Sequence, residues 1–275
     1  CLDAIHLLET LPPGRELALA YRVLAGLRML TQDYSTAIEL GERAVQLAGA
    51  SVTDSSTIVL GAQNVIASSW IMLDYEWGKQ LLERNLRDAH AAGLEHMAGL
   101  AYANFSSSAS EVHRFADAER AFQEGSTYAL ERGLDRYWHY LLAWRTHTLL
   151  RTGRWSEADV TATELLDRPN VSVTSRITAL TMLGLLRARC GQPEASALLD
   201  QALDLSRDLH SLHRVGLVRG ARAEAAWLAG DAARTRAEAE AIVELAVRKA
   251  HPWFAGELLY WLGRAGVSAP APGWL

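Results

Sequence analysis

The chain repeats an aromatic residue followed by a small residue at nearly constant intervals. The aromatic residues are Tyr34, Tyr75, Phe115 and Trp155. The small residues, three positions later, are Ala37, Gly78, Ala118 and Ala158. A period of about 40 residues is typical of stacked helical hairpins and not of one globular core. The sequence therefore predicts an all-α array, an architecture that mostly provides binding surfaces.

The repeat has a steric explanation. A small residue lets the second helix of a hairpin approach the first closely, while the aromatic residue covers the open end of the pair. Apolar residues recur at spacings of three and four along each expected helix, for example Tyr21, Leu24 and Ala25. These spacings place the apolar side chains on one helix face.

Glycines extend the register along the chain. Gly153, Gly191 and Gly230 follow one another at nearly the same period, and we expect them to end successive first helices in the left-handed conformation. The further glycines expected to act in the same way are Gly49, Gly93, Gly133 and Gly266. Pro252 suits the first position of a last helix.

We therefore expect thirteen helices, which form six antiparallel hairpins and a terminal helix near residues 252–265. Hydrophobic residues make up 49% of the 275 residues, and glycine- and proline-rich sequence occurs only at the end. These features predict one continuous superhelical domain over residues 1–275. The chain begins at Cys1, within an expected element, and we interpret it as a fragment of a larger multidomain protein.

Charge and composition argue against several classes of protein. The net charge is −5, and Lys79 and Lys249 are the only lysines. Nucleic-acid binding requires a basic face, so we expect no direct contact with nucleic acid. No apolar run reaches the ~18 residues of a membrane span, and the longest candidate lies near residues 179–186. Two cysteines are too few for a disulfide framework, which favours a cytoplasmic location.

The hairpins resemble the tetratricopeptide repeat (TPR) in a lengthened form. Several phrases are also similar to the repeat region of the large ATP-binding LuxR-type transcriptional regulators, relatives of the maltose-regulon activator. They are ALAYRVLAGLRML, YLLAWRTHTLLRTGRWSEA, LGLLRARCGQPEASALLDQAL, RAEAAWLAGD and HPWFAGELLYWLGRAG. In that family a P-loop ATPase module precedes the repeats and a DNA-binding helix-turn-helix follows them. Similar repeats also occur beside nucleotide-cyclase domains.

The resemblance implies a sensor and interaction module. Such a module binds a partner protein, a peptide or a small inducer, or holds its own ATPase module in an inhibited state. The chain has no G-x-x-x-x-G-K-[ST] loop and no basic recognition helix, so no ATPase or DNA-contacting residue can be assigned. We expect no cofactor.

Two asparagines mark a candidate ligand groove. Counted from the aromatic anchors, Asn64 and Asn104 occupy the same position in successive repeats. Asparagine offers both hydrogen-bond donors and an acceptor, and Ser107 is small enough to leave room for a ligand. We therefore expect these side chains in a concave groove lined by the first helices.

An aromatic and basic stretch follows in the fourth repeat. Tyr140, Trp144 and His147 lie around Arg145, a combination that suits a sugar ring, a peptide side chain or a carboxylate. For Trp144 an equal alternative exists, because Tyr140 and Trp144 are also spaced for packing between repeats.

The sequence gives little support to a catalytic site or a metal site. Asp208, His210 and His213 have a spacing that allows zinc binding, but no fourth ligand accompanies them. Exposed loop residues are the better interpretation, so we expect no metal. No nucleophile with its base and orienting group is recognisable, and we predict that the chain is not an enzyme.

Two functions therefore compete. The first is the regulatory domain described above, and the second is a passive scaffold or dimerisation module. The terminal helix bears on this choice because no later repeat covers its apolar residues. Trp253, Phe254, Leu258 and Trp261 are therefore expected to be exposed and to form an interface with a next hairpin or a homodimer partner.

Overall fold

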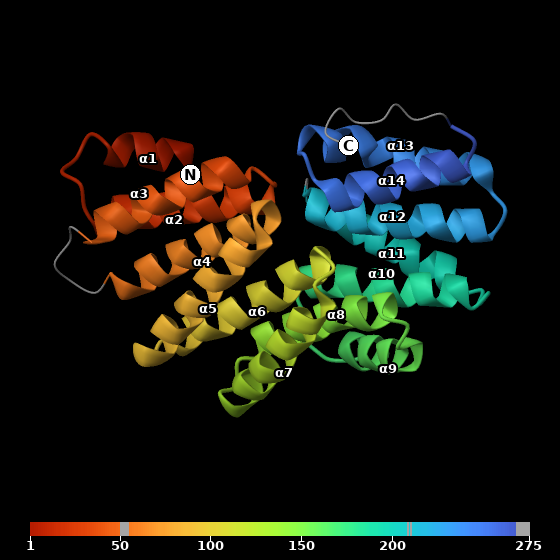
Figure 1. Ribbon diagram of the computed structural model, residues 1–275, viewed down its shortest axis with the longest axis horizontal. Helices are drawn as coiled ribbons and strands as arrows, with labels where there is room; N and C mark the ends of the chain where they lie inside the picture. The colour runs from red at the N-terminus through yellow and green to blue at the C-terminus, as the bar shows by residue number, and fades with distance from the viewer. Residues whose placement is uncertain (50–54, 208, 210, 268–275) are drawn as a thin grey trace. The chain divides into compact units, whose positions relative to one another are not determined.

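The computed structural model describes residues 1–49, 55–207, 209 and 211–267, and all regular elements in these ranges are α-helices (Figure 1). The glycine- and proline-rich tail from residue 268 onward lies outside the described residues. The chain divides into two compact units, residues 1–141 and 142–275. One continuous domain over residues 1–275 remains a prediction.

Unit 1 contains seven complete helices and the beginning of an eighth. They are α1 (Leu2–Leu8), α2 (Arg15–Leu30), α3 (Tyr34–Gly49), α4 (Ser56–Leu73), α5 (Tyr75–Ala91), α6 (Glu95–Glu111), α7 (Phe115–Glu131) and α8 (Asp135–Arg151), which continues into unit 2. Helices α2 and α3, α4 and α5, and α6 and α7 pack as hairpins.

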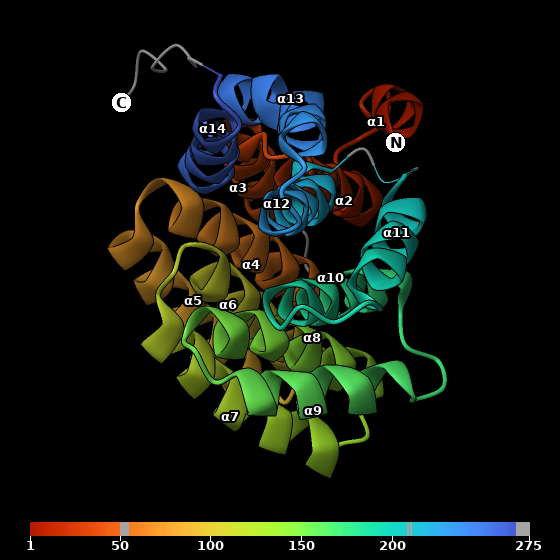
Figure 2. The same cartoon turned by 90° about the vertical axis from the view of Figure 1, so that its right-hand side faces the viewer.

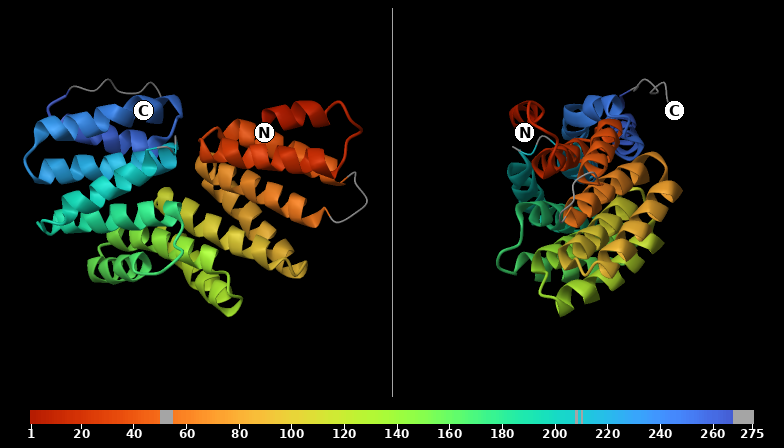
Figure 3. Two further views of the ribbon diagram at one scale, coloured as in Figure 1. Left: turned by 180° about the vertical axis from the view of Figure 1, so that it is seen from behind. Right: turned by 90° about the vertical axis from the view of Figure 1, so that its left-hand side faces the viewer.

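Unit 2 contains the remaining helices. They are α9 (Trp155–Leu166), α10 (Val173–Arg189), α11 (Ala195–Ser206), α12 (Leu212–Leu228), α13 (Ala232–Arg248) and α14 (Pro252–Arg264). Helices α10 and α11, and α12 and α13, pack as hairpins, and α14 packs on both α12 and α13 (Figure 2). The succession of helices within each unit can also be followed by colour in Figure 3.

The all-α hairpin prediction is confirmed. Six helix pairs, α2/α3 to α12/α13, and the terminal helix α14 account for the thirteen expected helices. The described residues contain one more helix, α1, which is short and carries no repeat anchor.

The aromatic and small residues have the predicted positions. Helices α3, α5, α7 and α9 each begin at the aromatic anchor of their repeat. The alanines three positions later are buried, and Gly78 lies directly against the backbone of α4. A Cβ atom on Gly78 would be 2.2 Å from the backbone nitrogen of Ile71 and 2.7 Å from the carbonyl carbon of Trp70. The close approach of the two helices therefore requires glycine at this position.

The turns explain why glycine marks only some repeats. Gly153, Gly191 and Gly230 have φ values of 78°, 69° and 77°, as predicted. In two earlier repeats Gln32 and His113 adopt the same left-handed conformation two residues before the aromatic anchor. The expectation for Gly49 is wrong, because it is the last residue of α3 and has no positive φ.

The turn between α4 and α5 differs from its neighbours. Asp74 alone separates the two helices, whereas three residues separate α2 from α3 and α6 from α7. Asp74 has an extended backbone, and its carboxylate accepts the N–H of Trp77 at 3.1 Å, which caps α5. A residue of α4 therefore has the structural position of the residue that lies two places further from the aromatic anchor in α2 or α6.

Helix α4 is long and apolar. Among the described residues, this helix is the one that is long and apolar enough to cross a membrane, in place of the segment near residues 179–186. More than half of it is buried inside the protein, and it packs against α2, α3, α5 and α6. Its position is that of a core helix in unit 1.

A charged cluster joins the second helices of neighbouring hairpins in unit 1. The carboxylate of Asp117 on α7 accepts hydrogen bonds from the Tyr75 hydroxyl at 2.6 Å, from Lys79 Nζ at 2.9 Å and from Arg120 at 3.1 Å. Burial by itself raises the pKa of Asp117, but these three donors outweigh it and hold the pKa below its ordinary value.

This cluster predicts a pH dependence of stability. Because the folded pKa of Asp117 is lowered, its contribution is present above the unfolded pKa of about 4 and is lost as the pH falls through the folded value. Asp117→Asn should cost about 2 kcal/mol at neutral pH. The difference in unfolding free energy between parent and variant should shrink below about pH 4. Denaturant titrations at several pH values measure it, with Asp88→Asn as the control for an exposed carboxylate. A difference independent of pH down to about 2.5 would contradict the assignment.

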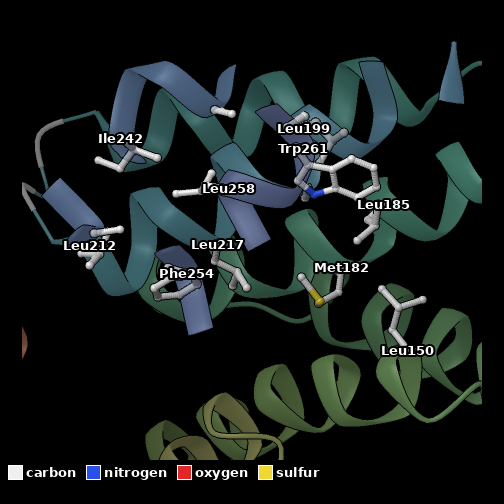
Figure 4. Close-up of a cluster of buried hydrophobic side chains, with 14 of the residues drawn as sticks. Leu150, Met182, Leu185, Leu199, Leu212, Leu217, Ile242, Phe254, Leu258 and Trp261 are labelled. Carbon is white, nitrogen blue, oxygen red and sulfur yellow. The ribbon is translucent and has the colours of Figure 1, made fainter. Parts of the chain in front are cut away.

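The core of unit 2 gathers side chains from all the helices α8 to α14. Phe254 lies beside Leu217, and the indole of Trp261 lies near Leu185 and Leu199 (Figure 4). Leu258 is completely buried between them. Helix α14 is thus an integral part of this core.

Two ion pairs connect helices across unit 2. Arg189 on α10 donates to Glu224 on α12 at 2.6 and 3.0 Å. Arg151, at the end of α8, donates to Glu257 on α14 at 2.9 Å, although the two residues are far apart in the sequence. The nearby Glu257 carboxylate raises the pKa of Arg151 above its ordinary value despite partial burial. Residues of the first and last helices of this unit are thereby in direct contact.

Candidate functional site

The predicted asparagines of unit 1 belong to a chain of amide hydrogen bonds. Asn104 Nδ2 donates to Asn64 Oδ1 at 2.5 Å, and Asn64 Nδ2 donates to Asn85 Oδ1 at 3.4 Å. Asn85 Nδ2 in turn donates to the backbone carbonyl of Leu60 at 2.9 Å. Asn64 and Asn85 are 1% and 2% exposed, and Asn104 is half-buried. The amides link α4, α5 and α6.

The short α4–α5 turn explains why Asn64 is not an open groove residue. Asn64 and Asn104 stand equally far ahead of their aromatic anchors in the sequence. Because the turn after α4 is shorter by two positions, Asn64 faces its own partner helix α5 in the way that Tyr102 faces α7. Counting along the sequence placed Asn64 with Asn104, but the helix geometry places it with Tyr102.

Asn85, the third member of the amide chain, lines a cleft in unit 1. The cleft has a volume of about 540 Å³ and lies between α3, α4 and α5. Its lining residues are Glu42, Val45, Gln46, Gln63, Ile66, Leu81, Arg84, Asn85 and Asp88. No repeat pattern in the sequence marks Asn85, because the residues at the same position of the neighbouring repeats are Ala44 and Gly125, which carry no amide side chain.

The cleft combines an apolar floor with amide and charged groups. Val45, Ile66 and Leu81 supply the apolar surface and are half-buried. The amides of Gln46 and Gln63 provide donors and acceptors that match a peptide backbone. The cleft volume lies in the range of ordinary ligand sites.

The charges at the rim of the cleft are mostly acidic. Arg84 lies 3.9 Å from Asp88 in an exposed ion pair, which offsets one of the two acidic side chains. Glu42 on α3 is exposed and makes none of the ion pairs found among the described residues. A ligand that carries an apolar side chain next to a basic group therefore matches this cleft best.

Most of the other predicted groove residues are buried. Ser107 is 4% exposed, and its hydroxyl donates to the carbonyl oxygen of Asn104 at 3.2 Å. Trp144 and His147 in unit 2 are 1% and 3% exposed, so the alternative of Trp144 as a core residue is the one that its burial favours. Tyr140 is half-buried. A ligand role for these residues remains a prediction.

Trp144 packs between two histidines of unit 2. The ring of His213 stacks on it with a centroid distance of 4.9 Å, and the ring of His147 meets it edge-on at 5.5 Å. The other two residues considered as zinc ligands, Asp208 and His210, lie outside the described residues. Within the described part of the chain, no group of three or more His, Cys, Asp or Glu residues is arranged to hold a metal ion.

The expected exposure of the terminal helix is wrong for three of its four candidate interface residues. Phe254, Leu258 and Trp261 are 5%, 0% and 7% exposed because α14 turns these side chains towards α12 and α13. Trp253 is 41% exposed, as predicted. Pro252 begins the helix, and His251 caps it by accepting the N–H of Phe254. The sequence showed the apolar face but not that the preceding hairpin covers it.

Comparisons with known proteins identify the fold. No family model matches the chain, and no curated protein matches it. Among solved structures, the chain is similar to the Rap conjugation gene regulator of the plasmid pLS20 in complex with the Phr* peptide, with a TM-score of 0.66 and 13% sequence identity. The match covers 92% of this chain and 74% of that chain. The likeness shows that the chain shares the helical-repeat fold of that regulator.

Proposed function

We propose that this chain is a regulatory repeat domain that binds a peptide segment of a partner protein in the cleft between α3, α4 and α5. The observation that carries the proposal is the cleft itself, about 540 Å³ with an apolar floor, amide side chains and an acidic rim. A segment with an apolar anchor side chain followed by a lysine or arginine has the complementary chemistry. The structure of the similar Rap regulator contains a bound peptide, which supports this class of ligand.

The broader setting rests on the sequence resemblance. We propose that the parent protein is a bacterial signalling or transcription regulator of the large LuxR type and acts in the cytoplasm. Its own ATPase module is one source of the bound segment. In this proposal the repeat domain performs no catalysis and makes no contact with nucleic acid.

A charge reversal at the rim tests the proposal. Short synthetic peptides with an apolar anchor and a flanking basic residue are screened by calorimetry against the chain. Glu42→Lys should weaken the best binder at least tenfold, which corresponds to about 1.4 kcal/mol, because it places a like charge next to the basic residue. Peptides whose basic residue is replaced by alanine should lose this sensitivity.

Glu39→Lys is the matched control. Glu39 is exposed on the same helix but does not line the cleft. Its replacement by lysine makes the same change in net charge as Glu42→Lys. Its affinity should stay within twofold of the parent. Equal losses from both variants would mean that binding is a general charge effect, and no binding by any peptide would reject the proposed function.

The alternative from the sequence, a passive scaffold or homodimer formed through α14, has less surface available than expected. Trp253 and Tyr260, 41% and 54% exposed, are the large aromatic side chains of α14 that remain outside the core. Trp253→Ser with Tyr260→Ser should leave sedimentation unchanged if the chain is monomeric. A dimer that these changes dissociate would favour the alternative.

A further inference from the structure

A second cavity lies in unit 2, where the turn between α10 and α11 meets the turn between α12 and α13. Its volume is about 330 Å³, at the small end of the range for metabolite sites. Leu199, Ala226 and Leu228 contribute apolar walls. Arg222 and Arg234 are its basic lining residues, so a largely apolar cavity contains two guanidinium groups.

Arg222 is fixed in the wall of this cavity. Its side chain is 8% exposed, and its Nε atom donates to Glu238 Oε1 at 2.7 Å. Its Nη1 atom donates to Asp200. Two carboxylates thus satisfy Arg222 and hold its guanidinium plane in one orientation.

Arg234 is placed differently. Its side chain is 45% exposed, and its guanidinium lies 3.6 Å from Asp200 Oδ1 and 4.0 Å from Glu238 Oε1. Both distances exceed those of hydrogen bonds. Arg234 is therefore held near the cavity by charge attraction, and its donors remain available to a ligand.

The charges of the ion-pair network balance at this site. Arg219 also donates to Glu238, at 2.5 Å, so three guanidinium groups share the carboxylates of Asp200 and Glu238. A third carboxylate, that of Asp231, lines the cavity, where it accepts the N–H of Arg234 at 2.9 Å and caps α13, so three acidic groups match the three basic ones.

The first turn of α11 faces the same cavity. Ala195 and Ser196 line it, and the N-cap residue Glu194, itself a carboxylate, makes no side-chain hydrogen bond to this end of α11. Backbone N–H groups at a helix N-terminus favour anions. This feature supports the arginine geometry but does not replace it.

We propose that this cavity binds a small organic anion, with a carboxylate or phosphate group held by Arg234 and a short apolar body against Leu199 and Ala226. Arg234 forms the two-pronged contact that a planar guanidinium makes with such groups. The fixed Arg222 and the first turn of α11 line the same cavity. This site lies in unit 2 and is independent of the peptide cleft proposed for unit 1.

The test uses the whole chain and defined probes. Pyruvate, 2-oxoglutarate, glycerol 3-phosphate and inorganic phosphate are compared by thermal shift with sodium chloride at equal ionic strength. At least one organic anion should raise the melting temperature more than sodium chloride does, and this increase should saturate as the anion concentration rises. Comparison of the carboxylates with the phosphates identifies the recognised group. Stabilisation by inorganic phosphate alone, or by none of the four probes, would overturn the proposal.

Three variants locate the binding. Arg234→Ala should weaken the effective anion at least tenfold, while Arg236→Ala, which removes a 57% exposed arginine paired with Glu240 on the same helix, should have no effect. Ala229→Leu enlarges an exposed residue of the cavity lining and should also abolish binding without changing the melting temperature of the free protein. Equal losses in Arg234→Ala and Arg236→Ala would reject the site. Glu42→Lys should leave anion binding intact, which separates this test from that of the peptide cleft.

Discussion

Replacing Gly78 with alanine should lower the free energy of unfolding by about 3 kcal/mol. The added methyl group would lie 2.2 Å from the backbone nitrogen of Ile71, and backbone atoms cannot move aside as a flexible side chain can. The two helices would have to separate, which would loosen the contact between α4 and α5. Denaturant unfolding of the chain, followed by circular dichroism, measures the change.

Gly256→Ala is the matched control for this prediction. Gly256 lies within α14, and a Cβ atom there would have no neighbour within 4 Å among the described residues. Alanine should stabilise this helix by about 0.5–1 kcal/mol, because glycine loses more backbone freedom on folding. If Gly78→Ala changed stability by less than ~0.5 kcal/mol, the close contact between the helices would be disproved.

Asn64→Ala should cost about 2–3 kcal/mol of stability, because it removes the central member of the amide chain. The Nδ2 atom of Asn104 would lose its acceptor and Oδ1 of the buried Asn85 would lose its donor. If Asn64 were the open groove residue that the sequence predicts, the same change would leave folding intact and would affect only ligand binding.

Gln80→Ala provides the comparison for the amide chain. Gln80 is an exposed amide on α5, and its removal should change the free energy of unfolding by less than ~0.5 kcal/mol. Equal small effects from the two variants would show that the buried amides contribute nothing to stability. Hydrogen exchange of the α4 and α6 amides would then locate any local loosening.

The repeat signal was sufficient to predict the hairpins. Tyr34, Tyr75, Phe115 and Trp155 mark the first residues of four second helices, because a bulky side chain at a turn and a small one a turn later are needed wherever two helices meet closely. This requirement is local in sequence, so it can be read without a structure. The helix α1 carries no such anchor and was missed.

The candidate site was harder to predict because it depends on register and on distant contacts. One deleted or inserted turn residue rotates a whole helix by about 100°, and the single residue between α4 and α5 moved Asn64 from the expected groove into a helix contact. Gln32 and His113 showed no recognisable turn signal, although they replace the glycine of later repeats. The pairing of Arg222 with Asp200 and Glu238 has no fixed spacing that a sequence pattern reveals.

The contact between Arg151 and Glu257 has a consequence for how unit 2 unfolds. In an open row of repeats, each unit touches only its neighbours, and the outermost helices fray first. The ion pair between Arg151 on α8 and Glu257 on α14 joins the first and last helices of this unit, so α14 cannot separate from the unit without breaking it. Helix α14 should therefore unfold together with the helices that it contacts and not ahead of them.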